Sequence, residues 1–235
     1  MMFSATYPKA IKDLVDSAIK NPLNIEISKI NTAASDIKQL VHPVESDRKR
    51  ALLYNLIVDE KWERVLVFTR TRRKADKVAR QMKTDGIKSA ALHSDKTQAE
   101  RTLILEEFKR GKIKALIATD VAARGLDIRD LPHVVNFDLP EIPEYYVHRI
   151  GRTGRAGKKG VAVSFVCRDE IENLSKIEEF INQKITLKRV QGFDYDQTVK
   201  KKPGRATNTG NKKKGIRGGK RKGTKKKKGK TRRGR

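Results

Sequence analysis

The segment YYVHRIGRTGRAGKKG, residues 145–160, combines positive charge and conformational freedom at a regular spacing. Three arginines and three glycines each recur at every third position: Arg149, Arg152, Arg155, Gly151, Gly154 and Gly157. Such a segment does not suit a core, because glycine contributes no packing and arginine is rarely buried without a partner. The pattern predicts a loop whose backbone and guanidinium groups approach an anion. The alternative is a solvated basic loop.

Further polar residues follow the ends of short apolar runs. Arg70 with Thr71, the segment 93–95, and Thr119 with Asp120 each come directly after such a run. If the runs are parallel strands, these residues gather at one edge of a sheet. Ligands of such sheets bind beyond the carboxyl ends of the strands. That edge is therefore where we expect the chemistry.

The elements that position these residues alternate between strand and helix from about Ser35 to Val190. IKQLVHPVE (37–45), RVLVFT (64–69) and SAALH (89–93) are typical of strands, and 47–60, 72–86 and 97–111 of helices. Thr97 with Glu100 forms a predicted capping box, and glycines follow two helix ends. The alternation continues through KALIATD, HVVNFD, YYVHRIG, GVAVSFV, EIENLSKIEEFIN and ITLKRV. We therefore expect the α/β class, with a mostly parallel sheet flanked by helices.

Charge is distributed unevenly along the 235 residues, whose net charge is +27. The segment 198–235 holds 19 of the 55 basic residues and none of the 28 acidic ones. With few apolar residues, the segment 191–235 is predicted to be a disordered Lys/Arg/Gly-rich tail. It lacks the aromatic residues of a base-stacking platform, so we expect non-specific attraction to phosphates, with a solubilising or localisation arm as the alternative.

Cysteine usage and hydropathy indicate a cytoplasmic setting, and a nuclear one stays open because lysine clusters also act as localisation signals. The chain has one cysteine, Cys167, so no internal disulfide forms, and we expect a buried structural thiol. No secretory signal and no apolar run of membrane-spanning length is present in the sequence, which predicts no membrane partner. The histidines show no metal-ligand spacing with cysteine, so we predict no metal site.

The motifs FSAT, VFTRT, HSDKTQAER, ATDVAARGLD and HRIGRTGRAG, in this order and spacing, resemble the second half of a DEAD-box ATP-dependent RNA helicase of the bacterial ribosome-assembly type. The resemblance implies a RecA-like C-terminal domain at 37–190. Residues 1–30, with a predicted helix and a short strand, then look like a remnant of the N-terminal RecA-like domain, and 31–36 like an interdomain linker. We expect residues 1–30 to be mobile or sticky without the rest of that domain.

The resemblance also implies a nucleotide site shared between two RecA-like domains. Arg152 and Arg155 match arginine fingers that reach the γ-phosphate of ATP, while His148 and Arg149 match residues that couple the two domains. Asp127 matches a position that contacts the ATP ribose, although an Asp that caps a turn is the alternative. Gly154 lets the loop turn close to the phosphates. ATP with Mg²⁺ is expected to be held mainly by the N-terminal domain.

RNA contacts are implied for residues that grip the sugar-phosphate backbone without reading sequence. The matching positions are Phe68, Thr69, Arg70, Ser94, Asp95, Thr119, Arg124 and Gly125. Ser94 departs from the commoner family form, which has glycine at this position. Thr71 belongs to the same motif as Thr69, but it could instead cap the helix that follows. Interdomain contacts are implied for Ser4, Thr6, Gln98 and Arg101, with a generic surface helix as the alternative for the last two.

The sequence contains no GxxxxGK[ST] string and no DEAD string. We therefore expect the C-terminal portion of an RNA-stimulated ATPase that unwinds short duplexes in ribosome assembly or RNA turnover, with ribosomal precursor particles among its partners. The 235 residues alone are expected to be inactive and to represent a truncated helicase. The alternatives are a non-catalytic basic RNA-binding module and a docking domain.

Overall fold

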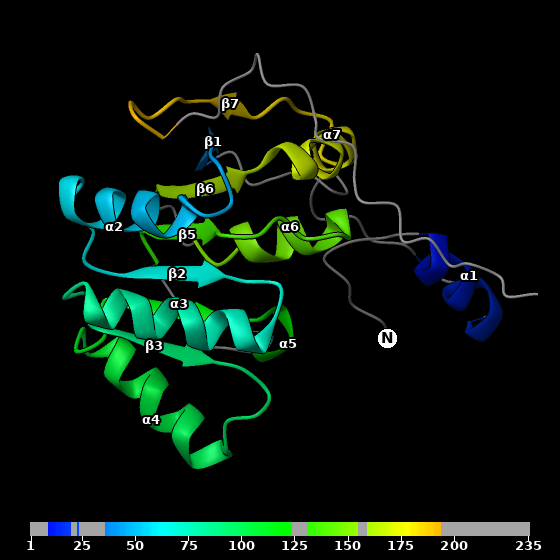
Figure 1. Cartoon of the computed structure of the whole chain (residues 1–235). Helices are drawn as coiled ribbons and strands as arrows, with labels where there is room; N and C mark the ends of the chain where they lie inside the picture. The colour runs from blue at the N-terminus through cyan, green and yellow to red at the C-terminus, as the bar shows by residue number, and fades with distance from the viewer. Residues whose placement is uncertain (1–8, 20–22, 24–35, 124–130, 155–158, 194–235) are drawn as a thin grey trace, which may run out of the picture. The chain divides into compact units, whose positions relative to one another are not determined.

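A computed structural model describes residues 9–19, 23, 36–123, 131–154 and 159–193 of the chain. Its centre is a sheet of seven parallel strands in the order β3-β4-β2-β5-β6-β1-β7 (Figure 1). The strands are β1 (Ile37–Pro43), β2 (Val65–Phe68), β3 (Ser89–Leu92), β4 (Ala115–Ala118), β5 (His133–Asn136), β6 (Gly160–Val166) and β7 (Thr186–Leu187). The predicted α/β class and parallel sheet are confirmed.

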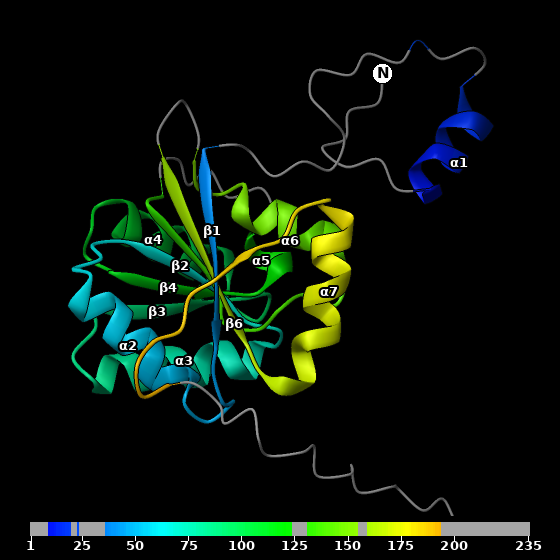
Figure 2. The same ribbon diagram turned by 90° about the horizontal axis from the view of Figure 1, so that it is seen from above.

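Helices connect the strands and cover both faces of the sheet (Figure 2). They are α2 (Lys49–Asp59), α3 (Arg72–Thr84), α4 (Gln98–Lys109), α5 (Asp120–Ala123), α6 (Pro143–Ile150), the 3₁₀ turn η1 (Arg168–Glu170) and α7 (Ile171–Phe180). One apolar cluster packs α2 and α3 on one face, and two others pack α4 to α7 on the opposite face. The strands β2 and β4 are buried along their whole length, which explains their nearly all-apolar sequences.

Local signals set several boundaries of the helices. The Thr71 side chain accepts a hydrogen bond from the Lys74 backbone N–H, which caps α3, so the predicted capping alternative for Thr71 is confirmed. Thr97 and Glu100 form the predicted capping box at the start of α4. Gly86 has φ +86°, a left-handed conformation that suits the residue after a helix end.

The YYVHRIG segment of the alternating pattern belongs to a helix, α6, in whose first turn Pro143 lies. The structure differs from the sequence expectations at two places. In the segment ITLKRV, which the alternating pattern included, only two residues form a strand, β7. Phe193 is 7% exposed and packs with the α2–α3 core cluster, so the ordered domain reaches beyond residue 190 into the segment predicted as tail.

Helix α1 (Lys9–Ala18) agrees with the helix predicted in the first 30 residues. Three predicted segments lie outside the described residues: the SAT motif, the linker apart from residue 36, and the tail from residue 194 onward. Of the short strand expected at 23–27, only residue 23 is described.

A buried ion pair joins α2 to η1. The Lys49 ammonium, 1% exposed, donates to Glu170 Oε2 at 2.6 Å and to the Phe137 carbonyl at 2.8 Å. Glu170 also accepts hydrogen bonds from the backbone N–H groups of Cys167 and Leu139, at 3.1 and 3.2 Å. Each charge is therefore neutralised and hydrogen-bonded, which a buried ion pair requires.

We predict that Lys49→Ala lowers the free energy of unfolding by about 3 kcal/mol, because the buried Glu170 carboxylate loses its hydrogen-bonded cation and keeps only Arg70, at 3.8 Å. Urea unfolding monitored by circular dichroism measures the loss. Lys176→Ala, which removes an exposed pair with Glu172, is the matched control and should cost under about 0.5 kcal/mol. Equal midpoints for the two variants would contradict the prediction, whereas Lys49→Met with Glu170→Gln should recover much of the loss.

Cys167 is 4% exposed, as predicted, and burial raises the pKa of its thiol to about 11. The thiolate is the reactive form. We therefore predict that iodoacetamide modifies the native chain at pH 8 about 100-fold more slowly than the urea-unfolded chain. Mass spectrometry over a time course measures both rates, and rapid modification of the native chain would refute the assignment.

Candidate functional site

A shallow hollow at the carboxyl edge of the sheet brings three segments together. Its lining comes from the end of β2, from α5, and from α6 with the residues that follow it: Phe68, Asp120, Ala123, Tyr145, His148, Arg149 and Arg152. Four of these, Phe68, His148, Arg149 and Arg152, belong to the predicted site. The structure thus gathers residues from separate motifs in one place.

Arg149 lies at the base of this hollow and is 2% exposed. Its guanidinium binds Asp120 through two hydrogen bonds, Nε to Oδ1 at 2.6 Å and Nη2 to Oδ2 at 2.8 Å. Nη1 donates to Asn136 Oδ1 at 3.1 Å and to the Asp138 carbonyl at 2.6 Å. The guanidinium carbon also lies 5.1 Å from the centre of the Phe68 ring. One side chain therefore ties α6 to α5, to β5 and to the end of β2.

The position of Arg149 differs from the one that the sequence led us to expect. A residue predicted to couple two domains has its described contacts inside one domain, and its charge is neutralised there by Asp120. The described contacts of Arg149 therefore position residues of its own domain. Sequence reasoning did not assign Asp120, Asn136 and Asp138 as partners of Arg149, although a polar Asn at the end of an apolar strand was an available signal.

The loop after α6 is held close to the sheet. The Arg152 backbone N–H donates to the Arg149 carbonyl at 3.1 Å, and the Thr153 hydroxyl donates to the Leu131 carbonyl. Gly154 has φ +63°, and a Cβ atom there would meet Ile37 Cγ1 at 2.6 Å. Gly154 is therefore required by a left-handed turn and by close packing on β1, as well as by any approach of phosphate. Arg152 is half-buried beside this turn.

Several predicted RNA-contacting side chains lie under the surface. Phe68, Thr69 and Thr119 are 2%, 0% and 8% exposed, so their side chains are not available for direct contact with RNA in this arrangement. Arg70, in contrast, is exposed at the same edge. Its backbone N–H donates to Asp138 Oδ2 at 3.0 Å, and its guanidinium lies 3.6 Å from a Glu141 carboxylate oxygen.

The loop after β3 is organised by a buried histidine. His93 is 2% exposed, and its Nδ1 accepts a hydrogen bond from the Asp95 backbone N–H at 3.3 Å. Its Nε2 lies 3.0 Å from Asp76 Oδ2. Burial alone raises the pKa of Asp76, but the hydrogen bond and charge of His93, together with Lys96, leave that pKa below its usual value. Ser94 and Asp95 are exposed on the loop, and Asp95 is ion-paired with Arg72.

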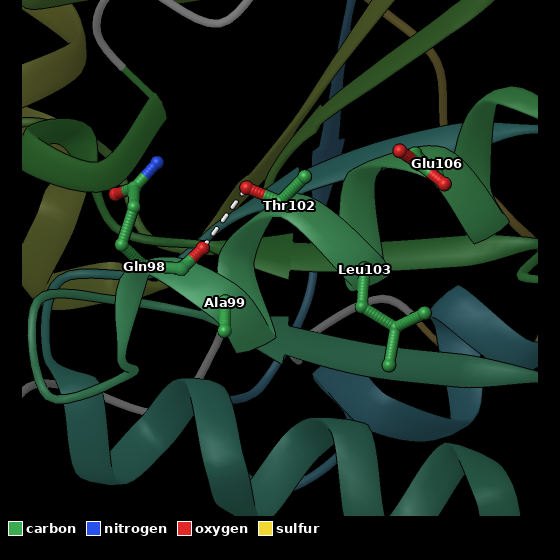
Figure 3. Close-up of a pocket in the computed structure, with 5 residues that line it drawn as sticks. All are labelled: Gln98, Ala99, Thr102, Leu103 and Glu106. Carbon is green, nitrogen blue, oxygen red and sulfur yellow. Dashed lines mark hydrogen bonds between the residues drawn. The ribbon is translucent and has the colours of Figure 1, made fainter.

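Gln98 and Arg101 lie at the start of α4. The Arg101 guanidinium donates to the Ala122 carbonyl of α5 at 3.4 Å, which braces α4 against the segment that follows β4. Gln98 is exposed and belongs to a second, open hollow along α4, lined by Gln98, Ala99, Thr102, Leu103 and Glu106 (Figure 3). That hollow lies on one helix and gathers none of the other predicted residues.

Six predicted site residues lie outside the described part of the chain: Ser4, Thr6, Arg124, Gly125, Asp127 and Arg155. Within the described ranges, no three His, Cys, Asp or Glu side chains are grouped so that they could hold a metal ion. No helix among the residues that the structure describes has both the length and the apolar character to span a bilayer.

We predict that Asp120→Ala lowers the free energy of unfolding by about 2 kcal/mol, because the buried Arg149 guanidinium loses its carboxylate. The value is below that of a fully buried pair because the Asp120 side chain is 23% exposed. Urea unfolding is the measurement, with the exposed Asp59→Ala as the control. A loss no greater than that of the control would show that the guanidinium fork does not hold α5.

Comparison with known proteins identifies the family. Residues 48–157 match the helicase conserved C-terminal domain. The ATP-dependent RNA helicase RhlB of Pseudomonas syringae pv. tomato is 42% identical over 186 residues, which cover 79% of this chain and 47% of that protein. The chain thus spans less than half the length of the curated RhlB relatives it matches.

Two solved structures are also similar. The E. coli DEAD-box protein SrmB, bound to regulator of ribonuclease activity A, is 34% identical with a TM-score of 0.66, covering 70% of this chain and 98% of that one. S. cerevisiae Dbp5, bound to RNA and ADP BeF₃, is 33% identical with a TM-score of 0.72. The match covers 80% of this chain and 50% of the Dbp5 chain. The chain belongs to the DEAD-box RNA helicase family, of which it carries the helicase conserved C-terminal domain.

Proposed function

We propose that this domain supplies the arginine-bearing half of an ATP-dependent RNA helicase site. In this proposal it closes with an N-terminal RecA-like domain around ATP and single-stranded RNA, and closure pries short duplexes apart. The observation that carries the proposal is the hollow at the carboxyl edge, where Arg152 lies beside the fixed Arg149–Asp120 pair. Family membership gives the same reading, since the RhlB relatives are ATP-dependent RNA helicases.

Arg152 and Arg155 are proposed to contact the γ-phosphate. Arginine keeps its charge and donates in a fixed fork, which stabilises the charge that spreads over the phosphoryl oxygens during transfer. Arg152 suits this role because its own backbone N–H donates to the Arg149 carbonyl and the hydroxyl of the next residue, Thr153, donates to the Leu131 carbonyl. Asp127 is proposed to bind the ribose, with Gly154 shaping the turn. Mg²⁺ would be held mainly by the N-terminal domain.

Arg149 and His148 are proposed to couple the domains in different ways. Arg149 is buried, so its contribution is to position α5 and the loop that carries Arg152. His148 is half-buried, lines the hollow and lies 6.4 Å from Tyr145 between ring centres. Its remaining exposure supports the proposed contact with a partner domain. Further interdomain contacts are proposed for Ser4, Thr6, Gln98 and Arg101.

RNA is proposed to lie along the carboxyl edge, held through its sugar-phosphate backbone. Arg70, Ser94 and Asp95 are exposed there, and Arg124 with Gly125 completes the set. For Phe68, Thr69 and Thr119, whose side chains are buried, the proposed contribution is to shape the backbone that RNA meets. Such contacts fix the position of the strand without reading its bases.

The proposed process is ribosome assembly or RNA turnover in the cytoplasm, with ribosomal precursor particles among the possible substrates. The basic segment from residue 191 is proposed to attract structured RNA through its charge, with a steep dependence on salt. The 235 residues alone are proposed to lack ATPase activity.

We predict that the 235-residue chain hydrolyses ATP at background rates, and that fusion to the N-terminal RecA-like domain of an RhlB relative restores RNA-stimulated hydrolysis. In that fusion, Arg152→Ala with Arg155→Ala should lower kcat by about 10³-fold or more, as for loss of an arginine finger. A coupled phosphate-release assay measures the rates.

Arg110→Ala, at an exposed position after α4, is the control and should leave kcat unchanged. RNA-stimulated hydrolysis by the unfused chain would contradict the proposed inactivity. An unchanged kcat in the double arginine variant of an active fusion would contradict the proposed role of the arginines.

A further inference from the structure

The outer face of α3 carries charge of one sign. Its exposed charged residues are all basic: Arg72, Arg73, Lys77, Arg80 and Lys83. The inner face consists of Ala75, Val78, Ala79 and Met82, which are buried against the sheet. Figure 1 shows α3 beside α2 on one face of the sheet, running back from the end of β2. The basic residues therefore project from that face.

The acidic residues of this region, Asp76 and Asp85, are half-buried and each is paired with a neighbouring group. Asp76 lies 3.0 Å from His93 Nε2 and 3.7 Å from Lys96 Nζ. Asp85, at the end of the helix, lies 2.6 Å from Arg50 Nη1. Both carboxylates are therefore neutralised by residues outside α3. Their charge does little to offset the outer face of the helix.

Most of the outward basic residues have no such partner. Arg72 pairs with Asp95, but Arg73, Lys77, Arg80 and Lys83 form no ion pair with any other residue that the structure describes. Arg73, Lys77 and Arg80 are spaced i, i+4 and i+7, so they form one stripe along the helix. We call these three residues the α3 stripe. It extends about 10 Å along the helix axis.

Other helices on the domain lack this segregation. The exposed face of α4 mixes Glu100, Leu103 and Glu106, and Figure 3 shows Leu103 and Glu106 on it. On α7, Lys176 pairs with Glu172 one turn away. A uniformly basic surface helix is therefore not a general property of this fold.

We infer that the α3 stripe binds the phosphodiester backbone of an RNA duplex that flanks the strand held at the carboxyl edge. The inference rests on the proposed function, which places RNA at Arg70. Helix α3 begins two residues after Arg70, so RNA that continues past this residue meets the stripe. With three cations, the stripe can contact about three phosphates of the duplex.

The chemistry of α3 favours RNA over a protein or a membrane. Among the described residues, no large exposed apolar side chain lies on α3. Those that are exposed lie on other segments: Leu23, Val58, Leu103, Val121, Ile142, Ile171 and Leu187. Protein interfaces have an apolar core, and amphipathic membrane helices insert apolar residues. A surface with cations and no apolar anchor is suited to phosphates.

The test compares the full chain with the variant Arg73→Gln/Lys77→Gln/Arg80→Gln. Fluorescence anisotropy measures binding of a short labelled single strand and of the same strand joined to a duplex hairpin, over a range of salt concentrations. The stripe variant should bind the hairpin-bearing RNA about tenfold more weakly at low salt. The slope of log K against log salt should fall by about 2 to 3, for three lost phosphate contacts. Binding of the short strand should match the unmodified chain.

The control variant Lys109→Gln/Arg110→Gln/Lys112→Gln removes the same charge from exposed positions at the end of α4, on the opposite face of the sheet. It should bind both RNAs like the unmodified chain, apart from a small uniform loss. Equal binding by the two variants would overturn the inference and leave the proposed function standing. No RNA binding by the unmodified chain would overturn both. Equal competition by polyglutamate and RNA at the stripe would also overturn it, since that shows attraction to any polyanion.

A crosslinking experiment locates the RNA independently. Cys167 is buried, so a cysteine introduced by Lys77→Cys is the accessible thiol for a photoreactive label. The labelled variant should crosslink to the duplex arm of the hairpin RNA, whereas Lys112→Cys with the same label should not. Crosslinks from Lys77→Cys that are confined to the single strand would contradict the inferred path.

Discussion

The arrangement of the carboxyl edge depends on one buried guanidinium group. Arg149 donates to Asp120 on α5 and to Asn136 and Asp138 at the end of β5, so the positive charge is neutralised and its donors are used. A buried charge is tolerated only under those conditions. The consequence is mechanical: α5, the end of β5 and the loop after α6 keep a fixed spacing. In the proposed helicase, a ligand that displaces α5 would also displace the loop that carries Arg152.

Asp138 connects this guanidinium to a second buried group. Its carbonyl accepts from Arg149, while its carboxylate accepts from Lys74 and from the Arg70 backbone N–H and lies 3.8 Å from Lys49. Lys49 in turn binds Glu170. A continuous polar layer thus links both helix-covered faces of the sheet at its carboxyl edge. Such layers contribute little net stability compared with apolar packing, so their value lies in holding exposed residues such as Arg70 in place.

The sequence predicted those features that short-range rules control. Apolar runs located the strands, and Thr71 and Thr97 marked helix starts through hydrogen bonds within three residues. The burial of Arg149 was not predictable in this way, because its acceptors lie 11 to 29 positions away and converge only in the fold. A motif likewise identifies a residue without showing whether its side chain is accessible. Phe68 and Thr69 match an RNA-binding motif, yet their side chains face the interior.

The same distinction explains why the net charge of the domain is a poor guide to its surfaces. Lys49 and Arg149 add to the formal charge, but each is buried and its charge is neutralised by a carboxylate. On α3 and at its end the carboxylates of Asp76 and Asp85 are paired, whereas four exposed basic side chains of α3 form no ion pair with any residue that the structure describes. Counterion release depends on the cations that reach phosphate, and not on the total in the sequence. Where the partners of each charge lie therefore decides which basic residues hold the fold together and which can hold RNA.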